Sequence, residues 1–244
     1  MLPARQTEAK LIKSSCIAAA ALLAQIAPAL AETRTFEVDP FTAVEISSGI
    51  IGIVTSGAGQ TVEAEAANAA VLNRLHVEVR GGRLSIGIDW NLLDYLFTFG
   101  QHPQITVRVA SPSLNSVVAS SGANVDARGM SGDFELGASS GAAVDATGVI
   151  AASVTAEASS GAGITISGSC DRLVVDTSSG GRVAAASFVC KVVDAEASSG
   201  GYSEVSASDE IEADVSSGGH VSVHGNPGRT NFESSSGGWI DTHP

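Results

Sequence analysis

Apolar and polar residues alternate along most of the chain after residue 105, and the alternation restarts at a fixed landmark. The landmark is Ser-Ser-Gly, which first occurs at Ser47 and later recurs at a nearly constant spacing. The later copies begin at Ser120, Ser139, Ser159, Ser178, Ser198, Ser216 and Ser235. A repeat of this length, with no helical periodicity between its landmarks, indicates stacked coils of β-strand.

Apolar residues occupy the same positions in successive repeats. The third residue before each landmark reads Val117, Leu136, Ala156, Val175, Ala195, Ala213 and Phe232. The fifth residue after its first serine reads Val125, Val144, Ile164, Val183, Ser203, Val221 and Ile240. Polar or small residues mostly separate these positions, as in strands with one face in a core. We therefore predict an all-β fold, a right-handed parallel β-helix (a solenoid) with coils of about 19 residues.

Ser-Ser-Gly is then expected at a corner of each coil. Glycine tolerates a positive φ, and serine hydroxyls can hydrogen-bond to the backbone of a turn. The other interpretation of a recurring serine is a nucleophile, which needs a base within hydrogen-bonding distance. The 5 histidines follow no matching repeat. We therefore expect no catalytic role for these serines.

The chain divides into a leader and one continuous domain. Residues 1–31 place Arg5, Lys10 and Lys13 before a short apolar run and end in Ala29-Leu30-Ala31, which is typical of a secretory signal peptide. Residues 32–119 are expected to form irregular N-terminal coils, and residues 120–244 the regular ones. No later apolar segment is long enough to span a bilayer. We expect an exported protein, periplasmic or at the cell surface.

An insertion at residues 87–104 interrupts the rhythm of the irregular coils. From Asp89 to Phe99 it is the bulkiest and most aromatic stretch after the leader. We expect this segment to cover an otherwise open side of the core. The alternatives are self-association through Asp89–Phe99 and a lip over a ligand, since large apolar patches on exported proteins usually contact something.

Two cysteines remain after the leader, and they share a register. Cys170 and Cys190 each stand eight residues before a landmark. Stacked strands lie about 4.8 Å apart, which is within the Cα range of a disulfide. Export favours oxidation, so we expect a Cys170–Cys190 disulfide; the alternative is two buried thiols.

The composition restricts the classes of molecule that the protein could bind. The net charge of −13 disfavours nucleic acid and anionic lipid, and favours neutral glycans, cations or basic partners. The same acidic surplus also keeps a long sheet soluble. The sequence contains no phosphate-binding loop, dinucleotide fingerprint or Cys/His metal motif, so we expect no cofactor and no metal.

One outward column changes character along the solenoid. The fourth residue after the first serine is small or polar in the early coils and large and planar in the last four, where it is Arg182, Tyr202, His220 and Trp239. Planar side chains at strand spacing suit a sugar ring or a peptide, and these four are our candidate ligand-binding residues. The competing interpretation is that they shield the open C-terminal end.

A second outward column carries carboxylates. It holds Asp126 and Asp145 on adjacent coils, with Glu204 and Asp241 farther along, and Thr165 and Ala184 interrupt it. Two such carboxylates could share Ca²⁺ or line a cleft like that of a polysaccharide lyase. Because no basic residue is expected in register beside Asp126 and Asp145, we interpret the column as solvated surface charge.

Three stretches resemble the head GIN domain family, whose function is unknown and whose members are labelled auto-transporter adhesins. They are 41–49 (Phe-Thr-Ala-Val-Glu-Ile-Ser-Ser-Gly), Val77-Glu78-Val79 with Gly82-Arg83-Leu84-Ser85-Ile86, and Ile105-Thr106-Val107 with Pro112-Ser113-Leu114-Asn115-Ser116-Val117. With the coils that follow, the likeness covers roughly residues 35–225. It implies a right-handed β-helix on an exported bacterial protein and no catalytic residues.

These observations favour a structural or binding module of the bacterial envelope, adhesin-like, which presents one face to an envelope polysaccharide or protein and is not an enzyme. The alternative is a β-helical polysaccharide lyase or hydrolase. That alternative requires a groove with clustered carboxylates and an arginine or lysine, whereas a flat face favours the module.

Overall fold

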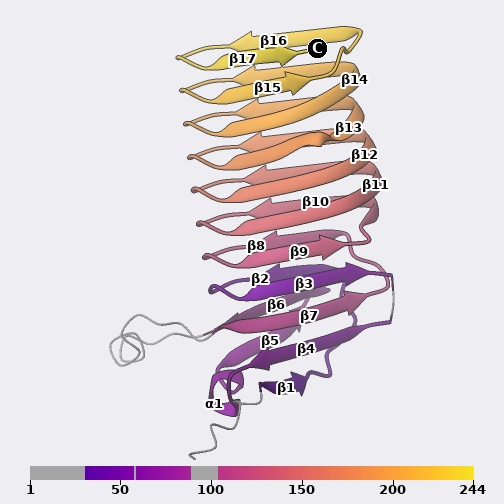
Figure 1. Cartoon of the computed structure of the whole chain (residues 1–244), viewed down its shortest axis with the longest axis vertical. Helices are drawn as coiled ribbons and strands as arrows, with labels where there is room; N and C mark the ends of the chain where they lie inside the picture. Colours follow the sequence, from indigo (N-terminus) through magenta and orange to yellow (C-terminus); the bar gives the residue numbers. More distant parts are fainter. Residues whose placement is uncertain (1–30, 58, 89–103) are drawn as a thin grey trace, which may run out of the picture.

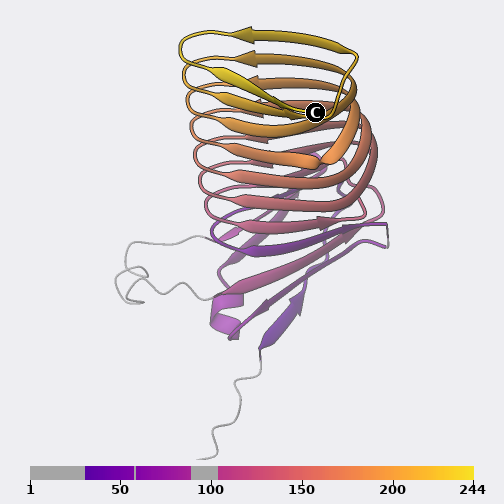
Figure 2. The same cartoon turned by 45° about the horizontal axis from the view of Figure 1, so that its top comes forward.

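The strands stack into one right-handed solenoid. The computed structural model describes residues 31–57, 59–88 and 104–244. In this part of the chain the strands join in one 17-stranded sheet. Figure 1 shows the strands lying across the long axis, with β1 at one end and β16 and β17 at the other. Seen from the β17 end, the coils rise counter-clockwise toward the viewer (Figure 2), which confirms the predicted fold.

The N-terminal section mixes coils with antiparallel hairpins. Its elements are β1 (Glu32–Thr35), β2 (Ala43–Ile46), β3 (Ile51–Ser56), β4 (Thr61–Ala66), α1 (Ala69–Leu72), β5 (Leu75–Arg80), β6 (Arg83–Ile88) and β7 (Ile105–Ser111). Strand β5 pairs antiparallel with β6, and β4 pairs antiparallel with both β1 and β7. The Gly81-Gly82 turn is therefore a hairpin, and both glycines have positive φ.

The order of the first coils in space differs from their order in the chain. The β2–β3 coil pairs in parallel with β6 and β7 on one side, and with β8 and β9 on the other. The end of β6 at Ile88 and the start of β7 at Ile105 lie beside the ends of β2 and β3 that the Ser47-Ser48-Gly49 corner joins. The predicted contact surface Asp89–Phe99 lies outside the described residues.

The regular section follows the predicted register. Its strands are β8 (Ser116–Ala119), β9 (Asn124–Arg128), β10 (Ser131–Ala138), β11 (Ala143–Ala158), β12 (Gly163–Thr177), β13 (Arg182–Ala197), β14 (Tyr202–Val215), β15 (His220–His224), β16 (Arg229–Ser234) and β17 (Trp239–His243). They pair in parallel with the neighbouring coils, on both sides from β8 to β15 and on one side only for β16 and β17. Equivalent residues such as Val144, Ile164 and Val183 lie directly above one another.

The predicted apolar columns form the core. Val117, Leu136 and Val175 are at most 1% exposed, and so are their counterparts in the other coils up to Ala213. The last coil is the exception: Phe232 is 38% exposed, because no described coil lies above it. The alternation therefore predicts burial correctly wherever a coil has a neighbour on both sides.

Ser-Ser-Gly forms the predicted corner, through its backbone. The second serine and the glycine both have positive φ, as at Ser121 (50°) and Gly122 (74°). The N–H of Ala123 donates to the carbonyl of Ser120 at 3.1 Å, which closes a type I′ turn. Within the described chain, the expected hydrogen bonds from corner serine hydroxyls to backbone carbonyls occur only at the first landmark, from Ser47 and Ser48.

Candidate functional site

The four planar side chains form a continuous stack on one face of the solenoid. Arg182, Tyr202, His220 and Trp239 are the first residues of β13, β14, β15 and β17, and they pair in register. The Arg182 guanidinium carbon lies 4.4 Å from the centre of the Tyr202 ring. The Tyr202 and His220 ring centres are 4.8 Å apart, edge to face, and those of His220 and Trp239 are 4.6 Å apart and stacked. We call these four residues the planar ladder.

Two carboxylates of the adjacent column hold the ladder in place. Glu204 accepts hydrogen bonds from the Tyr202 hydroxyl at 2.6 Å and from Arg182 Nη2 at 3.1 Å. Asp241 Oδ2 lies 2.9 Å from Nε2 of His220. Burial, and then the hydrogen bond to Glu204, raise the pKa of Tyr202 above its ordinary value, so its phenol stays neutral at physiological pH. The ladder is therefore fixed before any ligand arrives.

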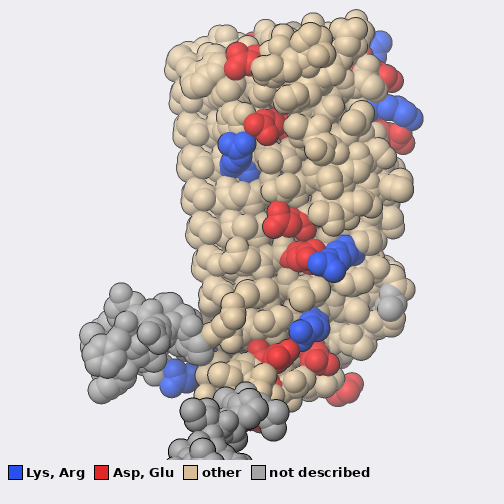
Figure 3. Space-filling model, in the orientation of Figure 1, with Lys and Arg blue, Asp and Glu red and all other residues tan. Residues whose placement is uncertain are grey.

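The ladder remains open to solvent along the solenoid. Trp239 is 49% exposed, the Arg182 side chain is 54% exposed, and the His220 side chain is 17% exposed. Figure 3 shows the face formed by β3, β9, β15 and β17: it is flat, its charged side chains are few, and acidic and basic groups lie beside one another. A flat platform with polar edges suits ring stacking combined with hydrogen bonds.

The second predicted column is only partly as expected. Asp126 and Asp145 pair in register on adjacent coils. The residues in register beside this pair are Ile53 and Thr165, neither of them basic, but on the same strand Arg128 Nε donates to Asp126 Oδ1 at 2.9 Å. This hydrogen bond lowers the pKa of Asp126. Among the described residues, no three Asp, Glu, His or Cys side chains converge to hold a metal ion.

The face of the solenoid on the other side of the Ser-Ser-Gly corners carries a row of carboxylates that the sequence analysis missed. One residue in each of five successive coils faces outward in the same register, and the five are Glu157, Asp176, Glu196, Asp214 and Glu233. None of the ion pairs found among the described residues includes a member of this row. The signal is present in the sequence, because each acidic residue stands two places before a landmark.

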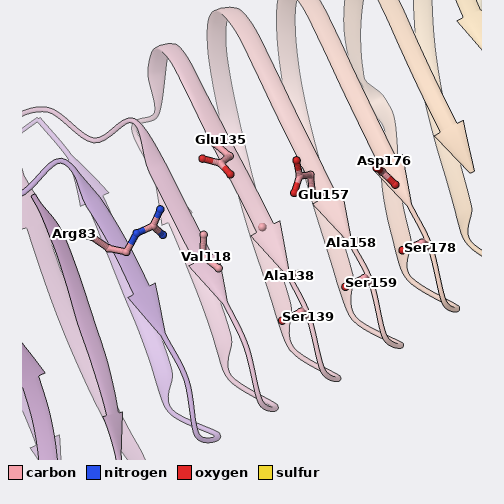
Figure 4. A pocket seen from close by; sticks show the side chains of 11 residues that line it. Arg83, Val118, Glu135, Ala138, Ser139, Glu157, Ala158, Ser159, Asp176 and Ser178 are labelled. Carbon is pink, nitrogen blue, oxygen red and sulfur yellow. The ribbon is translucent and has the colours of Figure 1, made fainter. Parts of the chain in front are cut away.

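Shallow hollows run between this acidic row and the column of first serines. One, of about 380 Å³, is lined by Glu135, Glu157 and Asp176 on one side and closed at its end by Arg83. Figure 4 shows Glu135, Glu157 and Asp176 on successive coils, and Arg83 at the end of the hollow beyond Val118. A second hollow, of about 400 Å³, continues along Glu196 and Asp214. Glu157 and Asp176 are exposed to solvent.

The two cysteines lie where the register predicts. Cys170 of β12 pairs with Cys190 of β13, their Cα atoms are 4.5 Å apart, and a disulfide joins them. Both side chains are buried, at 7% and 1% exposure. The redox state of this pair in solution stays a prediction.

Comparison with known proteins agrees with the fold. Residues 40–227 match the family model described as "Putative auto-transporter adhesin, head GIN domain". A putative adhesin of Bacteroides fragilis is similar in structure, with a TM-score of 0.76 and 14% identity, covering 87% of this chain and 97% of that one.

Two further solved structures have the same architecture. A putative adhesin of Parabacteroides merdae has a TM-score of 0.59 and 16% identity, over 88% of this chain and 96% of that one. A protein of Parabacteroides distasonis named as a putative lipid binding protein has a TM-score of 0.55 and 15% identity, over 88% of this chain and 97% of that one. No protein of curated function matches the chain. No helix in the described residues is long and apolar enough to cross a membrane.

Proposed function

The chain belongs to the head GIN domain family, and on this premise we propose that it is an exported, adhesin-like binding module of the bacterial cell envelope. Its ligand is a neutral glycan of that envelope. The observation that carries the proposal is the planar ladder, which presents ring faces in register and fixed polar edges on an open face.

The chemistry of the ladder favours a glycan over other polymers. Sugar rings present apolar C–H faces to aromatic rings and hydroxyls to neighbouring carboxylates and guanidinium groups. Three steps of about 4.8 Å give a ladder roughly 14 Å long, enough for two or three sugar rings. The net charge of −13 disfavours polyanions.

Binding of envelope polysaccharide to variants of the ladder tests this function. Tyr202→Ala and Trp239→Ala should each weaken retention on a glycan array or on immobilised polysaccharide by at least about tenfold, since each removes one stacking surface. The matched control is His224→Ala with His243→Ala, because these two rings also stack, 5.1 Å apart, in the same coils but outside the ladder. The control should bind normally.

Unchanged binding by Tyr202→Ala and Trp239→Ala, with circular dichroism showing intact strands, would refute the role of the ladder. Equal losses in the ladder variants and in the histidine control would point instead to a general effect on the last coils. The far-ultraviolet spectrum and the melting curve of each variant separate these outcomes.

A second function, β-helical polysaccharide lyase or hydrolase, is favoured by one observation. The hollow lined by Glu135 and Glu157 combines carboxylates with Arg83, as such an enzyme requires. The open setting of Glu157 argues against it, because a general acid or base is normally shielded from bulk water. Incubation with envelope polysaccharides should release no reducing ends and no unsaturated sugars. Turnover that Glu135→Gln abolishes would establish the enzyme instead.

Export by residues 1–31 is part of the same proposal. The mature protein should begin at Glu32 and appear in the periplasm or at the surface. Cell fractionation followed by N-terminal sequencing decides this, and a cytoplasmic protein that keeps its leader would contradict it.

A further inference from the structure

The end of the solenoid opposite β1 is an unpartnered sheet edge. Strand β16 pairs only with β14, and β17 pairs only with β15. In the part of the chain that the structure describes, no strand covers their outer edges. Half of the backbone N–H and C=O groups of β16 and β17 therefore face outward, in a form that readily pairs with another strand (Figure 1).

The core is open at this same end. Phe232 is 38% exposed, although the residues below it in the same column are at most 1% exposed. Ile240, the last member of the facing column, is only partly buried. Natural solenoids normally close such an end with a polar capping repeat, and this last coil instead carries apolar side chains into solvent.

We propose that a second copy of this chain covers the open end, so that two solenoids join end to end about a two-fold axis. With the axis parallel to the strands, β16 of each copy lies on β17 of the other, and both pairs run antiparallel. The chain rises along the solenoid axis within each coil, so the outer edges of β16 and β17 lie at different heights. With the two-fold axis parallel to the strands, the lower strand of each copy faces the higher strand of the other.

Inward residues of one copy must face inward residues of the other, because side chains alternate along each strand. Only two registers meet this condition and also keep the corners of the two copies nearly superposed. One places Phe232 opposite Ile240 of the second copy and Asn231 opposite its Asp241. The other places Glu233 opposite Asp241, two like charges directly across a strand pair, which is destabilising. The first register closes the core with apolar side chains and aligns an amide with a carboxylate, so it is the one proposed.

The alternative two-fold axis, perpendicular to the sheets, is less favourable. It lays β17 on β17 of the second copy and brings the two copies of Asp241 near each other. It also sets both lower strands on one side and both higher strands on the other, which leaves a gap on one side. The repulsion between the two copies of Asp241 and the heights of the strands therefore both favour the axis parallel to the strands.

The area of the proposed interface sets the expected stability of the dimer. Strands of about 20 Å, in two sheets with their side chains about 30 Å across, give roughly 600 Å² per copy. The total of about 1,200 Å² lies at the lower limit for stable interfaces. We therefore expect a dimer that dissociates on dilution.

Sedimentation velocity and light scattering of the full chain over a range of concentrations test the proposal. The wild type should pass from monomer to dimer, and Phe232→Asp should remain monomeric because it places a charge in the new core. The matched control is Ile150→Asp, since Ile150 is 74% exposed and distant from this end. It should dimerise normally. A wild type that stays monomeric, or a Phe232→Asp dimer, would overturn the proposal.

Cysteine cross-linking tests the register. The double variant Asn231→Cys/Asp241→Cys should form a disulfide-linked dimer on mild oxidation, and neither single variant should do so. Efficient cross-linking of either single variant would indicate the perpendicular axis and refute the proposed one. A dimer lost on deletion of 89–99 and kept in Phe232→Asp would assign self-association to that segment instead.

Discussion

Reduction of the Cys170–Cys190 disulfide should destabilise the solenoid by about 3 kcal/mol. The bond closes a loop with a sequence separation of 20 residues, one full coil. In the chain-entropy model, a loop of this size restricts the unfolded chain by about 3 kcal/mol at room temperature. We expect the native state to contribute little to the difference, because both side chains are buried and in register on neighbouring strands.

Urea unfolding followed by far-ultraviolet circular dichroism, with and without reductant, measures this difference. The matched control is Cys170→Ala/Cys190→Ala, whose midpoint should be lower than that of the oxidised protein and should not respond to reductant. Unfolding of neighbouring coils is coupled in solenoids, so the midpoint of the whole β-signal is the appropriate readout. An oxidised and a reduced protein that unfold at the same urea concentration would refute the reasoning, as would free thiols in the protein purified without reductant.

Two further changes test the corners and the acidic row. Gly181→Ala should cost about 1–3 kcal/mol in a melting experiment, because the added Cβ would overlap the carbonyl of Ala158 in the coil below; Gly161→Ala has open space and should cost only the strain of its φ of +72°, about 1–2 kcal/mol. A neutral Gly181→Ala would show that this corner relaxes freely. Glu196→Gln should stabilise by a few tenths of a kcal/mol at low salt, by removing the central charge of the acidic row, and the gain should vanish at high salt. A gain that is independent of salt would contradict repulsion as its cause.

The regular coils could be predicted from the sequence because one landmark fixes their register. Once Ser-Ser-Gly marks each corner, counting from it places every residue on a face and above its neighbour. Before β8 the chain contains the landmark only once, at Ser47, so counting has no second reference point there. The antiparallel pairing of β4 with β7, and the placement of the β2–β3 coil between later strands, depend on tertiary contacts that no local pattern encodes.

The planar ladder was predicted for the same reason, since it is a column of the repeat. Its supporting contacts were not, because the hydrogen bonds of Glu204 to Tyr202 and Arg182 depend on side-chain rotamers rather than on register. Arg128 beside Asp126 was missed because it lies two places along the same strand, not on an adjacent coil. The acidic row was readable by the same counting, at a position two places before each landmark.

The spatial order of the first coils has a consequence for assembly. The β2–β3 coil has both of its edges occupied, by β6 and β7 on one side and by β8 and β9 on the other. Its pairing on the first side joins Ala43 to Arg83 and Ile51 to Thr106, which is slow because long loops must close first. Every strand from β10 onward instead finds its template already in place, one coil back. The unfolded chain would therefore form its N-terminal coils slowly and then add the remaining coils rapidly, in chain order.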